Sequence, residues 1–158
     1  MEHLWAPWRN SYVTQKSPPD AELFAKIGQS TDDATNHVLA RSKSCFAVLN
    51  AFPYNAGHLM IVPYRQLSQL EELSDDEWLD LIGLLKKMKA ALTEVMHPHG
   101  FNVGFNLGSA AGAGIVSHLH LHLVPRWNND ANFMATTAGT RIHPNDLDGI
   151  WKQLTAVL

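Results

Sequence analysis

Residues 117–127 read SHLHLHLVPRW, in which three histidines alternate with three leucines. Successive side chains of a β-strand point to opposite faces, so a strand here places His118, His120 and His122 on one face and the leucines on the other. We expect the leucine face to be buried in the core. The imidazoles are then expected to line the opposite surface, as the floor of a cleft.

A row of histidines can bind a metal ion, because neutral imidazole is the commonest metal ligand. At about 3.4 Å per residue, His118 and His122 lie about 13 Å apart, so no ion with ligands at about 2 Å reaches all three rings. One His-x-His pair could hold an ion if a third ligand came from elsewhere, and His58 is the candidate. This interpretation stays open as an alternative.

The same row suits phosphate chemistry. Neutral imidazole is a nucleophile toward phosphorus, and neighbouring imidazoles can donate hydrogen bonds to the phosphate oxygens. Directly before the row, residues 108–117 read GSAAGAGIVS, and such small residues let backbone amides approach an anion closely. A glycine-rich loop alone is a weak signal, but its place beside the histidines strengthens the prediction of a phosphate site.

Composition limits the classes of protein to consider. With 158 residues, of which 46% are hydrophobic and 17% charged, the chain is expected to form one globular domain. A formal net charge of −3 argues against general nucleic-acid binding. Cys45 is the only cysteine, which excludes an internal disulfide and favours a reducing, cytoplasmic setting. We expect neither a secretory signal nor a membrane-spanning segment, because the N-terminus has no long apolar stretch after a basic start and no apolar run is long enough to span a membrane.

The regular elements predicted from the pattern are strands, one long helix, and further strands. Residues 45–51 and 57–65 are two apolar runs separated by a turn, and residues 101–108 form another strand before the histidine strand. Ser74 and Glu77 predict a capping box at the start of a helix over 74–96. Its apolar stripe, expected to face the core, is Trp78, Leu81, Ile82, Leu85, Met88, Leu92 and Val95. This order indicates the α+β class, with an antiparallel sheet covered on one face.

The two ends of the chain are less patterned than its centre. We take residues 1–43 as an N-terminal arm with Trp5 and Trp8 as packing anchors, and 44–127 as the core of the domain. Residues 128–158 are a C-terminal extension of the same domain. It contains a predicted last helix over 144–158, opened by Asn145 and weakened by Gly149.

Two motifs together resemble the histidine triad (HIT) family of nucleotide hydrolases and transferases. HLHLHLV matches the family's His-φ-His-φ-His-φ-φ signature, where φ is apolar. In NAFPYNAGHLMIVPYR, Asn50 stands eight positions before the histidine of a Gly-His pair, His58, as in the family. The resemblance runs from about Cys45 to Trp127. The stretches HLWAPWR, GAGIVSHLHLHLVPRW and NFM are similar to the bacterial branch related to diadenosine tetraphosphate hydrolases and phosphorylases.

The resemblance implies an architecture and a set of catalytic roles. It implies a five-stranded antiparallel sheet with one long and one C-terminal helix, and a homodimer in which the sheets of two subunits join. It implies that His120 attacks the α-phosphorus and carries a covalent nucleotidyl intermediate. His118 and His122 would bind around the phosphate and leaving-group oxygens, and His58 would buttress the row.

The resemblance also implies substrate-binding positions. Asn50 matches the residue that binds the ribose, Val48 would face the base, and Asn106 stands near the position that contacts the phosphates. Many members carry Gln and Ser or Thr where this chain has Gly114 and Ile115. Phosphate contacts in this loop are therefore assigned to backbone amides, those of Gly112, Ala113 and Gly114.

The expected ligand is an adenine nucleotide, with magnesium bound by the substrate. Bacterial relatives with a structural zinc carry a Cys-x-x-Cys pair, which residues 21–27 lack, so we expect no bound metal; His97 and His99 are expected to be an exposed pair. Two rival functions remain, a nucleotide-binding module with vestigial catalysis and an adenosine phosphoramidate hydrolase.

Overall fold

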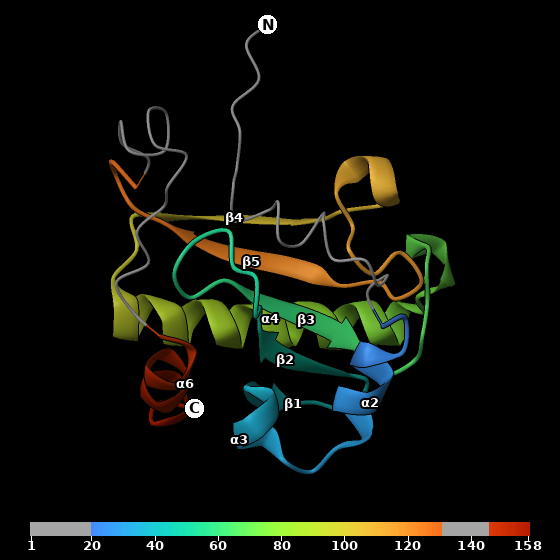
Figure 1. Ribbon diagram of the computed structural model, residues 1–158, viewed down its shortest axis with the longest axis horizontal. Coiled ribbons are helices and arrows are strands. Elements are labelled where there is room, and N and C mark those ends of the chain that lie inside the picture. Colours follow the sequence, from blue (N-terminus) through green and yellow to red (C-terminus); the bar gives the residue numbers. More distant parts are fainter. Residues whose placement is uncertain (1–19, 131–145) are drawn as a thin grey trace, which may run out of the picture.

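The structure, a computed structural model, describes residues 20–130 and 146–158 (Figure 1). No helix in these ranges is long and apolar enough to cross a membrane. The predictions for Trp5, Trp8 and Asn145 concern residues outside them. In chain order the elements are α2 Leu23–Gln29, α3 Asp33–Asn36, β1 Val38–Arg41, β2 Cys45–Leu49, β3 Leu59–Pro63, η1 Leu70–Glu72, α4 Asp75–Met96, β4 Gly100–Phe105, η2 Ser109–Ala111, β5 Leu121–Arg126 and α6 Leu147–Thr155.

The five strands form one antiparallel sheet in the order β1-β2-β3-β5-β4, which confirms the predicted α+β class and its five-stranded sheet. β2 and β3 pair along their whole length, from Cys45 opposite Pro63 to Leu49 opposite Leu59. The turn before β3 contains Gly57, whose φ of +71° favours glycine. A side chain there would also meet the sulfur of Met96, since an added Cβ would lie 2.6 Å from it.

β1 forms one edge of the sheet and comes from the segment taken as an N-terminal arm. The sequence pattern did not locate this strand. It has only four residues, and its pairing with β2 shifts register between Val38 and Ala40. A strand so short and irregular offers no alternation to detect.

Helix α4 begins and ends as predicted, but one residue of its expected stripe is wrong. Ser74 accepts a hydrogen bond from the Glu77 amide, and the Glu77 carboxylate accepts one from the Ser74 amide. Ile82 is 41% exposed, whereas Leu84, which the stripe left out, is 5% exposed. The helix is rotated about its axis relative to the expected stripe. Its buried face is centred on Leu81, Leu84 and Met88, and Ile82 lies at the margin of that face.

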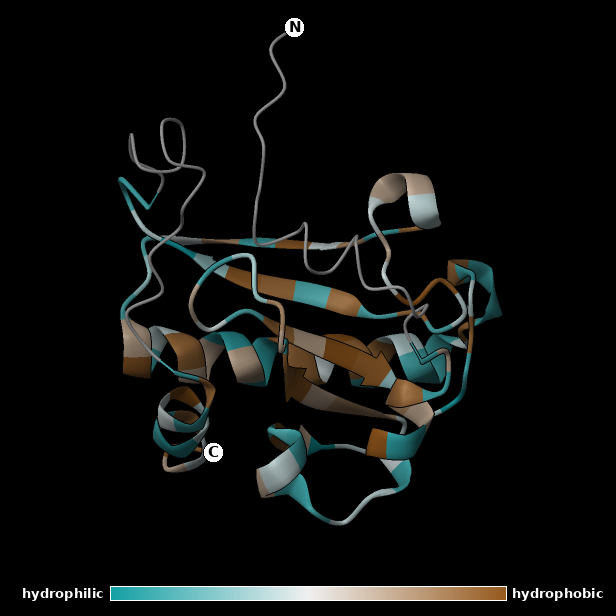
Figure 2. Cartoon of the chain, viewed as in Figure 1, coloured by the Kyte–Doolittle hydropathy of each residue, from teal (hydrophilic) through white to brown (hydrophobic). Residues whose placement is uncertain are grey.

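The inner strands β2, β3 and β5 are buried on both faces of the sheet. On the α4 side, leucines of β3 and β5 pack with residues of α4 and α6. On the other side, Phe24 of α2 packs with Phe46, Val48 and Met60 in a second cluster. β2 and β3 are therefore buried at every position, which explains their continuous apolar sequences (Figure 2).

The histidine run is only partly a strand, which corrects the prediction. β5 begins at Leu121, so His118 and His120 precede it. The ladder with β3 covers only Leu121 to Leu123. Before it, the Leu119 amide donates instead to the carbonyl of Leu67, in the loop after β3.

Helix α6 confirms the predicted C-terminal helix and lies beside the β1 edge (Figure 1). Its N-cap is Asp146, which accepts a hydrogen bond from the Gly149 amide, so the prediction that Asn145 opens the helix was wrong. The Trp151 indole donates to the Val38 carbonyl at 2.8 Å, which ties the helix to β1.

Candidate active site

Strand pairing aligns residues from three distant segments on one face of the sheet. Val48 lies opposite Met60 in β3, and Met60 lies opposite His122 in β5. Directly paired residues of neighbouring strands point to the same face. The residue expected to face a base and one of the three histidines therefore share a face, with Met60 between them.

The histidine face is not an open cleft floor, so that expectation was wrong. His58 and His118 are at most 1% exposed, and His120 and His122 are each 7% exposed. The ring of Phe24 lies 5.5 Å from that of His118 and 5.2 Å from that of His120. Tyr54 covers the other two imidazoles, with ring distances of 4.6 Å to His58 and 5.5 Å to His122. Aromatic side chains from two separate segments thus cover the row.

His118 is linked to His120 through its main-chain carbonyl group. Its Nε2–H donates to the Pro63 carbonyl at 2.8 Å, and its ring is completely buried. Its Nδ1 is the one buried side-chain nitrogen or oxygen without a hydrogen-bond partner in residues 20–130 and 146–158. Its carbonyl oxygen accepts a hydrogen bond from His120.

His120 has the tautomer that a nucleophile needs. Its Nδ1 lies 2.8 Å from the His118 carbonyl oxygen. Since a carbonyl only accepts, Nδ1 carries the proton and Nε2 keeps its lone pair. Burial lowers the pKa of His120 below its ordinary value of 6.5, so the ring is neutral at pH 7.

His58 and His122 are hydrogen-bonded to each other. Nε2 of His58 lies 2.9 Å from Nδ1 of His122. Burial and the neighbouring imidazoles lower the pKa of His58 to about 3 and that of His122 to about 4. Both rings are therefore uncharged at neutral pH, and their shared hydrogen bond joins β5 to the residue just before β3.

Asn50 lies beside His58, at the end of β2. Its Oδ1 accepts a hydrogen bond from the Phe52 amide at 2.9 Å, and its Nδ2 lies 3.4 Å from His58 Nδ1. The structure therefore brings this predicted ribose-binding residue to the edge of the histidine cluster.

Asn106 and the following loop lie at the other side of His122. Asn106 Nδ2 lies 3.2 Å from His122 Nε2. The loop after it closes on itself, because the Gly112 amide donates to Ser109 and the Ala113 amide to Gly108. These two amides, expected to bind phosphate, make hydrogen bonds within the loop.

Sequence reasoning missed Tyr54 and Phe24 as neighbours of the histidines. Tyr54 belongs to the segment read as a turn, and its position four residues before His58 was the signal that could have found it. Phe24 lies in the segment taken as an N-terminal arm. Both residues lie next to the histidines only because the folded chain brings their segments together.

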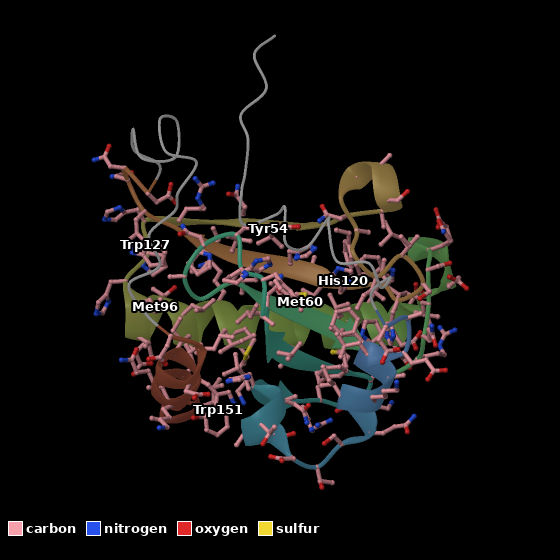
Figure 3. All side chains as sticks on the ribbon, viewed as in Figure 1. Tyr54, Met60, Met96, His120, Trp127 and Trp151 are labelled. Atoms are coloured by element: carbon pink, nitrogen blue, oxygen red, sulfur yellow. The ribbon has the colours of Figure 1, made fainter. Side chains whose placement is uncertain are left out.

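Trp127, His97 and His99 lie away from this cluster. Trp127 lies at the opposite end of β5 from His120, and its indole donates to the Met96 carbonyl at 3.3 Å (Figure 3). His97 and His99 are exposed after α4, and His99 Nδ1 accepts from the Asn128 amide. In the described part of the chain, no three His, Cys, Asp or Glu side chains are grouped to hold a metal ion.

Comparisons with known proteins agree on one family. The sequence model of the HIT domain matches residues 31–129. An "AP-4-A phosphorylase" of Mycobacterium tuberculosis (strain ATCC 25618 / H37Rv) is 43% identical over 152 residues, which cover 91% of this chain and 77% of that protein. The "Adenosine 5'-monophosphoramidase hnt1" of Schizosaccharomyces pombe is 26% identical over 134 residues, covering 85% of this chain and 96% of that protein.

Solved structures share the fold. A Zn-bound histidine triad family protein from Mycobacterium smegmatis has a TM-score of 0.67 and 24% sequence identity, covering 85% of this chain and 90% of that chain. At this identity the likeness concerns the arrangement of strands and helices.

Proposed function

The chain belongs to the HIT domain family, and from that premise we propose that it cleaves dinucleoside polyphosphates through a covalent nucleotidyl intermediate on His120. Diadenosine tetraphosphate is the proposed substrate. The similarity to an AP-4-A phosphorylase supports this choice and favours inorganic phosphate as the acceptor.

The observation that carries the proposal is the hydrogen bond between His120 Nδ1 and the His118 carbonyl. It fixes the proton on one nitrogen and leaves the lone pair on the other, Nε2. Because the ring is also uncharged at pH 7, it needs no prior deprotonation.

The proposed reaction has two displacements at one phosphorus atom. First, the Nε2 lone pair of His120 forms a bond to the α-phosphorus, and the bond from phosphorus to the bridging oxygen breaks. The electron pair stays on the leaving polyphosphate, whose charge substrate-bound magnesium would partly neutralise. An oxygen of phosphate then attacks the phosphorus, and the electron pair of the P–N bond returns to His120. This releases ADP, whereas attack by water releases AMP and a proton.

Substrate contacts are proposed for the residues around the row. Asn50, beside His58, is proposed to bind the ribose, and Val48 to face the base. Asn106 and the backbone of the loop at Gly112, Ala113 and Gly114 are proposed to bind the phosphates. The amides of Gly112 and Ala113 would have to exchange their hydrogen bonds within the loop for bonds to phosphate.

The test compares the wild-type protein with His120→Asn. Each is incubated with diadenosine tetraphosphate, with and without inorganic phosphate, and the products are resolved by ion-exchange chromatography. We expect the wild type to release ATP with ADP when phosphate is present and ATP with AMP when it is absent, and the variant to release neither. His99→Asn, which changes an exposed histidine outside the site, should match the wild type. Nucleotide binding without turnover by the wild type would contradict the proposal and favour a binding module.

A second candidate is the hydrolysis of adenosine phosphoramidates. The similarity to an adenosine 5'-monophosphoramidase favours it. The same attack by His120 would release an amine in place of a polyphosphate. A higher kcat/KM for adenosine 5'-phosphoramidate than for diadenosine tetraphosphate would make this the principal activity.

We also propose a homodimer and a cytoplasmic location. β4 is an edge strand with Val103 48% exposed, which supports pairing with a second copy of the sheet. The single, buried Cys45 supports a reducing compartment. Sedimentation of the wild type against Val103→Lys tests the first proposal, because a charge at a paired edge should shift the protein toward monomer.

A further inference from the structure

We propose that Tyr54 is a positioning residue of this site: its backbone amide fixes which nitrogens of His58 and His122 carry protons, and its hydroxyl holds the carboxamide of Asn106. The consequence is an Nε2–H on neutral His122, which Asn106 accepts in the free protein and which a phosphate or leaving-group oxygen would accept in its place on binding. This inference rests on the proposed function for its catalytic consequence.

The first step is the hydrogen bond from the Tyr54 backbone amide to His58. The amide nitrogen lies 3.0 Å from His58 Nδ1. A backbone amide only donates, so Nδ1 must accept, and neutral His58 therefore carries its proton on Nε2.

The second step transfers this constraint to His122. His58 Nε2–H faces His122 Nδ1 at 2.9 Å and donates to it. His122 Nδ1 is therefore an acceptor, and neutral His122 carries its proton on Nε2. A non-titrating backbone group thus fixes the direction of both hydrogen bonds.

The third step concerns Asn106, whose Nδ2 lies 3.2 Å from His122 Nε2 and 3.0 Å from the Tyr54 hydroxyl. If His122 Nε2 carries a proton, the Asn106 Nδ2–H and the His122 Nε2–H are two donors that face each other. Neither can accept, so a partly buried donor would be left without a hydrogen bond. Turning the carboxamide over brings Oδ1 to that place, where it accepts from His122 and from the Tyr54 hydroxyl. A phenol can donate or accept, so Tyr54 holds Asn106 in either orientation.

The loop that carries Tyr54 is held on both sides. The Phe52 amide donates to Asn50 Oδ1, and Asn55 Nδ2 donates to the Pro125 carbonyl and to Asp130 Oδ2 at 3.1 and 2.9 Å. Asp130 in turn binds Arg126 at 2.6 Å. These contacts fix the backbone of Tyr54, and its ring stacks on His122 with an interplanar angle of 28°.

The direct test is the ring-nitrogen NMR spectrum of the wild-type protein at neutral pH. Two-dimensional 1H–15N correlations, assigned with single-histidine variants, report which nitrogen carries the proton. We expect Nε2–H tautomers for both His58 and His122. A proton on Nδ1 of His122 would overturn the inference, whatever the enzymatic activity.

The kinetic test is Tyr54→Phe, which keeps the amide and the ring but removes the hydroxyl. We expect the tautomers to persist, kcat to fall about tenfold and KM to change less than about threefold, since one hydrogen bond to Asn106 is lost. Tyr64→Phe is the matched control, because Tyr64 packs on Phe46 away from this network, and it should behave as wild type. An unchanged kcat in Tyr54→Phe would overturn the role of the hydroxyl. The expected tautomers in a protein without turnover would support the network and contradict the proposed function.

Discussion

The inner strands β2, β3 and β5 are buried on both faces of the sheet, but the residues packed on the two faces differ. On the α4 face, apolar side chains such as Leu121, Leu123 and Leu81 pack together in one cluster. On the opposite face, four imidazoles are buried beside Val48, Met60 and other apolar residues. The first face needs only shape and hydrophobicity, whereas on the second most imidazole nitrogens have a defined hydrogen-bond partner, with Nδ1 of His118 as an exception.

The α4 face therefore contributes mainly to the stability of the fold, and the histidine face contributes mainly to the chemistry of the site. Leucines contribute by removing apolar surface from water, and their contribution is spread over many contacts. Buried imidazoles cost free energy unless paired, and the partners that pair them also fix their tautomers. We therefore expect substitutions on the α4 face to change mainly stability, and substitutions on the histidine face to change mainly activity.

The largest expected effect is on activity, from His120→Asn on the histidine face. We expect kcat for diadenosine tetraphosphate to fall by at least about 10⁴-fold, because the nucleophile is lost. We expect the free energy of unfolding to change by less than about 1 kcal/mol, because the asparagine Nδ2 can still donate to the His118 carbonyl. Urea unfolding measured beside the kinetics checks both parts. A variant that is inactive because it is unfolded would contradict the comparison.

The next effect is on stability, from Leu123→Ala on the α4 face. Leu123 is completely buried in the cluster with α4. We expect the free energy of unfolding to fall by about 3 kcal/mol, through lost burial and a cavity. Well below the melting temperature, kcat should stay within about twofold of wild type. A large loss of kcat in the folded variant would show that the two faces are coupled.

The buried histidines also make the stability of the protein depend on pH. The pKa values of His58 and His122, about 3 and about 4, lie below the ordinary value of 6.5. Below that value the unfolded chain binds more protons than the folded one, so stability is full above about pH 6.5 and is lost as the pH falls toward 4. Once the unfolded state is protonated, each such histidine lowers the free energy of unfolding by about 1.4 kcal/mol for every unit that the pH falls.

Urea unfolding between about pH 7 and about pH 5 measures this slope. We expect His122→Asn to flatten it by the share of one histidine. Equal slopes in the wild type and His122→Asn would contradict the depressed pKa of His122.

The smallest effect distinguishes two residues of α4. Ile82→Ala should change the free energy of unfolding by less than about 0.5 kcal/mol, because its side chain is 41% exposed. Leu84→Ala, at a position 5% exposed, should cost between about 2 and about 5 kcal/mol. Thermal unfolding of the two variants checks the rotation of the helix. A larger loss for Ile82→Ala would mean that α4 packs with a different face.

Features of the fold that depend on local sequence could be predicted. The capping box of Ser74 and Glu77 needs only residues three apart, and β2 and β3 were evident from their apolar runs. β1 could not be found because its four residues, interrupted by a register shift, acquire their strand conformation from β2. Ile82 was misplaced because a broad apolar stripe does not determine where its centre lies.

The candidate site was only partly predictable for a related reason. The spacing of His118, His120 and His122, with the family resemblance, identified the row. It did not reveal that Phe24 and Tyr54 cover it, or that His118 acts through its carbonyl. These relations depend on hydrogen bonds and ring contacts between distant segments, which periodicity does not record.

The central claim is that His120 Nε2 is the nucleophile, and trapping the intermediate tests it most directly. Wild-type protein is mixed with diadenosine tetraphosphate, quenched within the first turnover in alkaline denaturant, which preserves P–N bonds, and mapped by peptide mass spectrometry. Our account predicts one adenylyl group, on His120, that disappears when inorganic phosphate is added before the quench. Turnover without an adduct on His120, or an adduct on another residue, would contradict it.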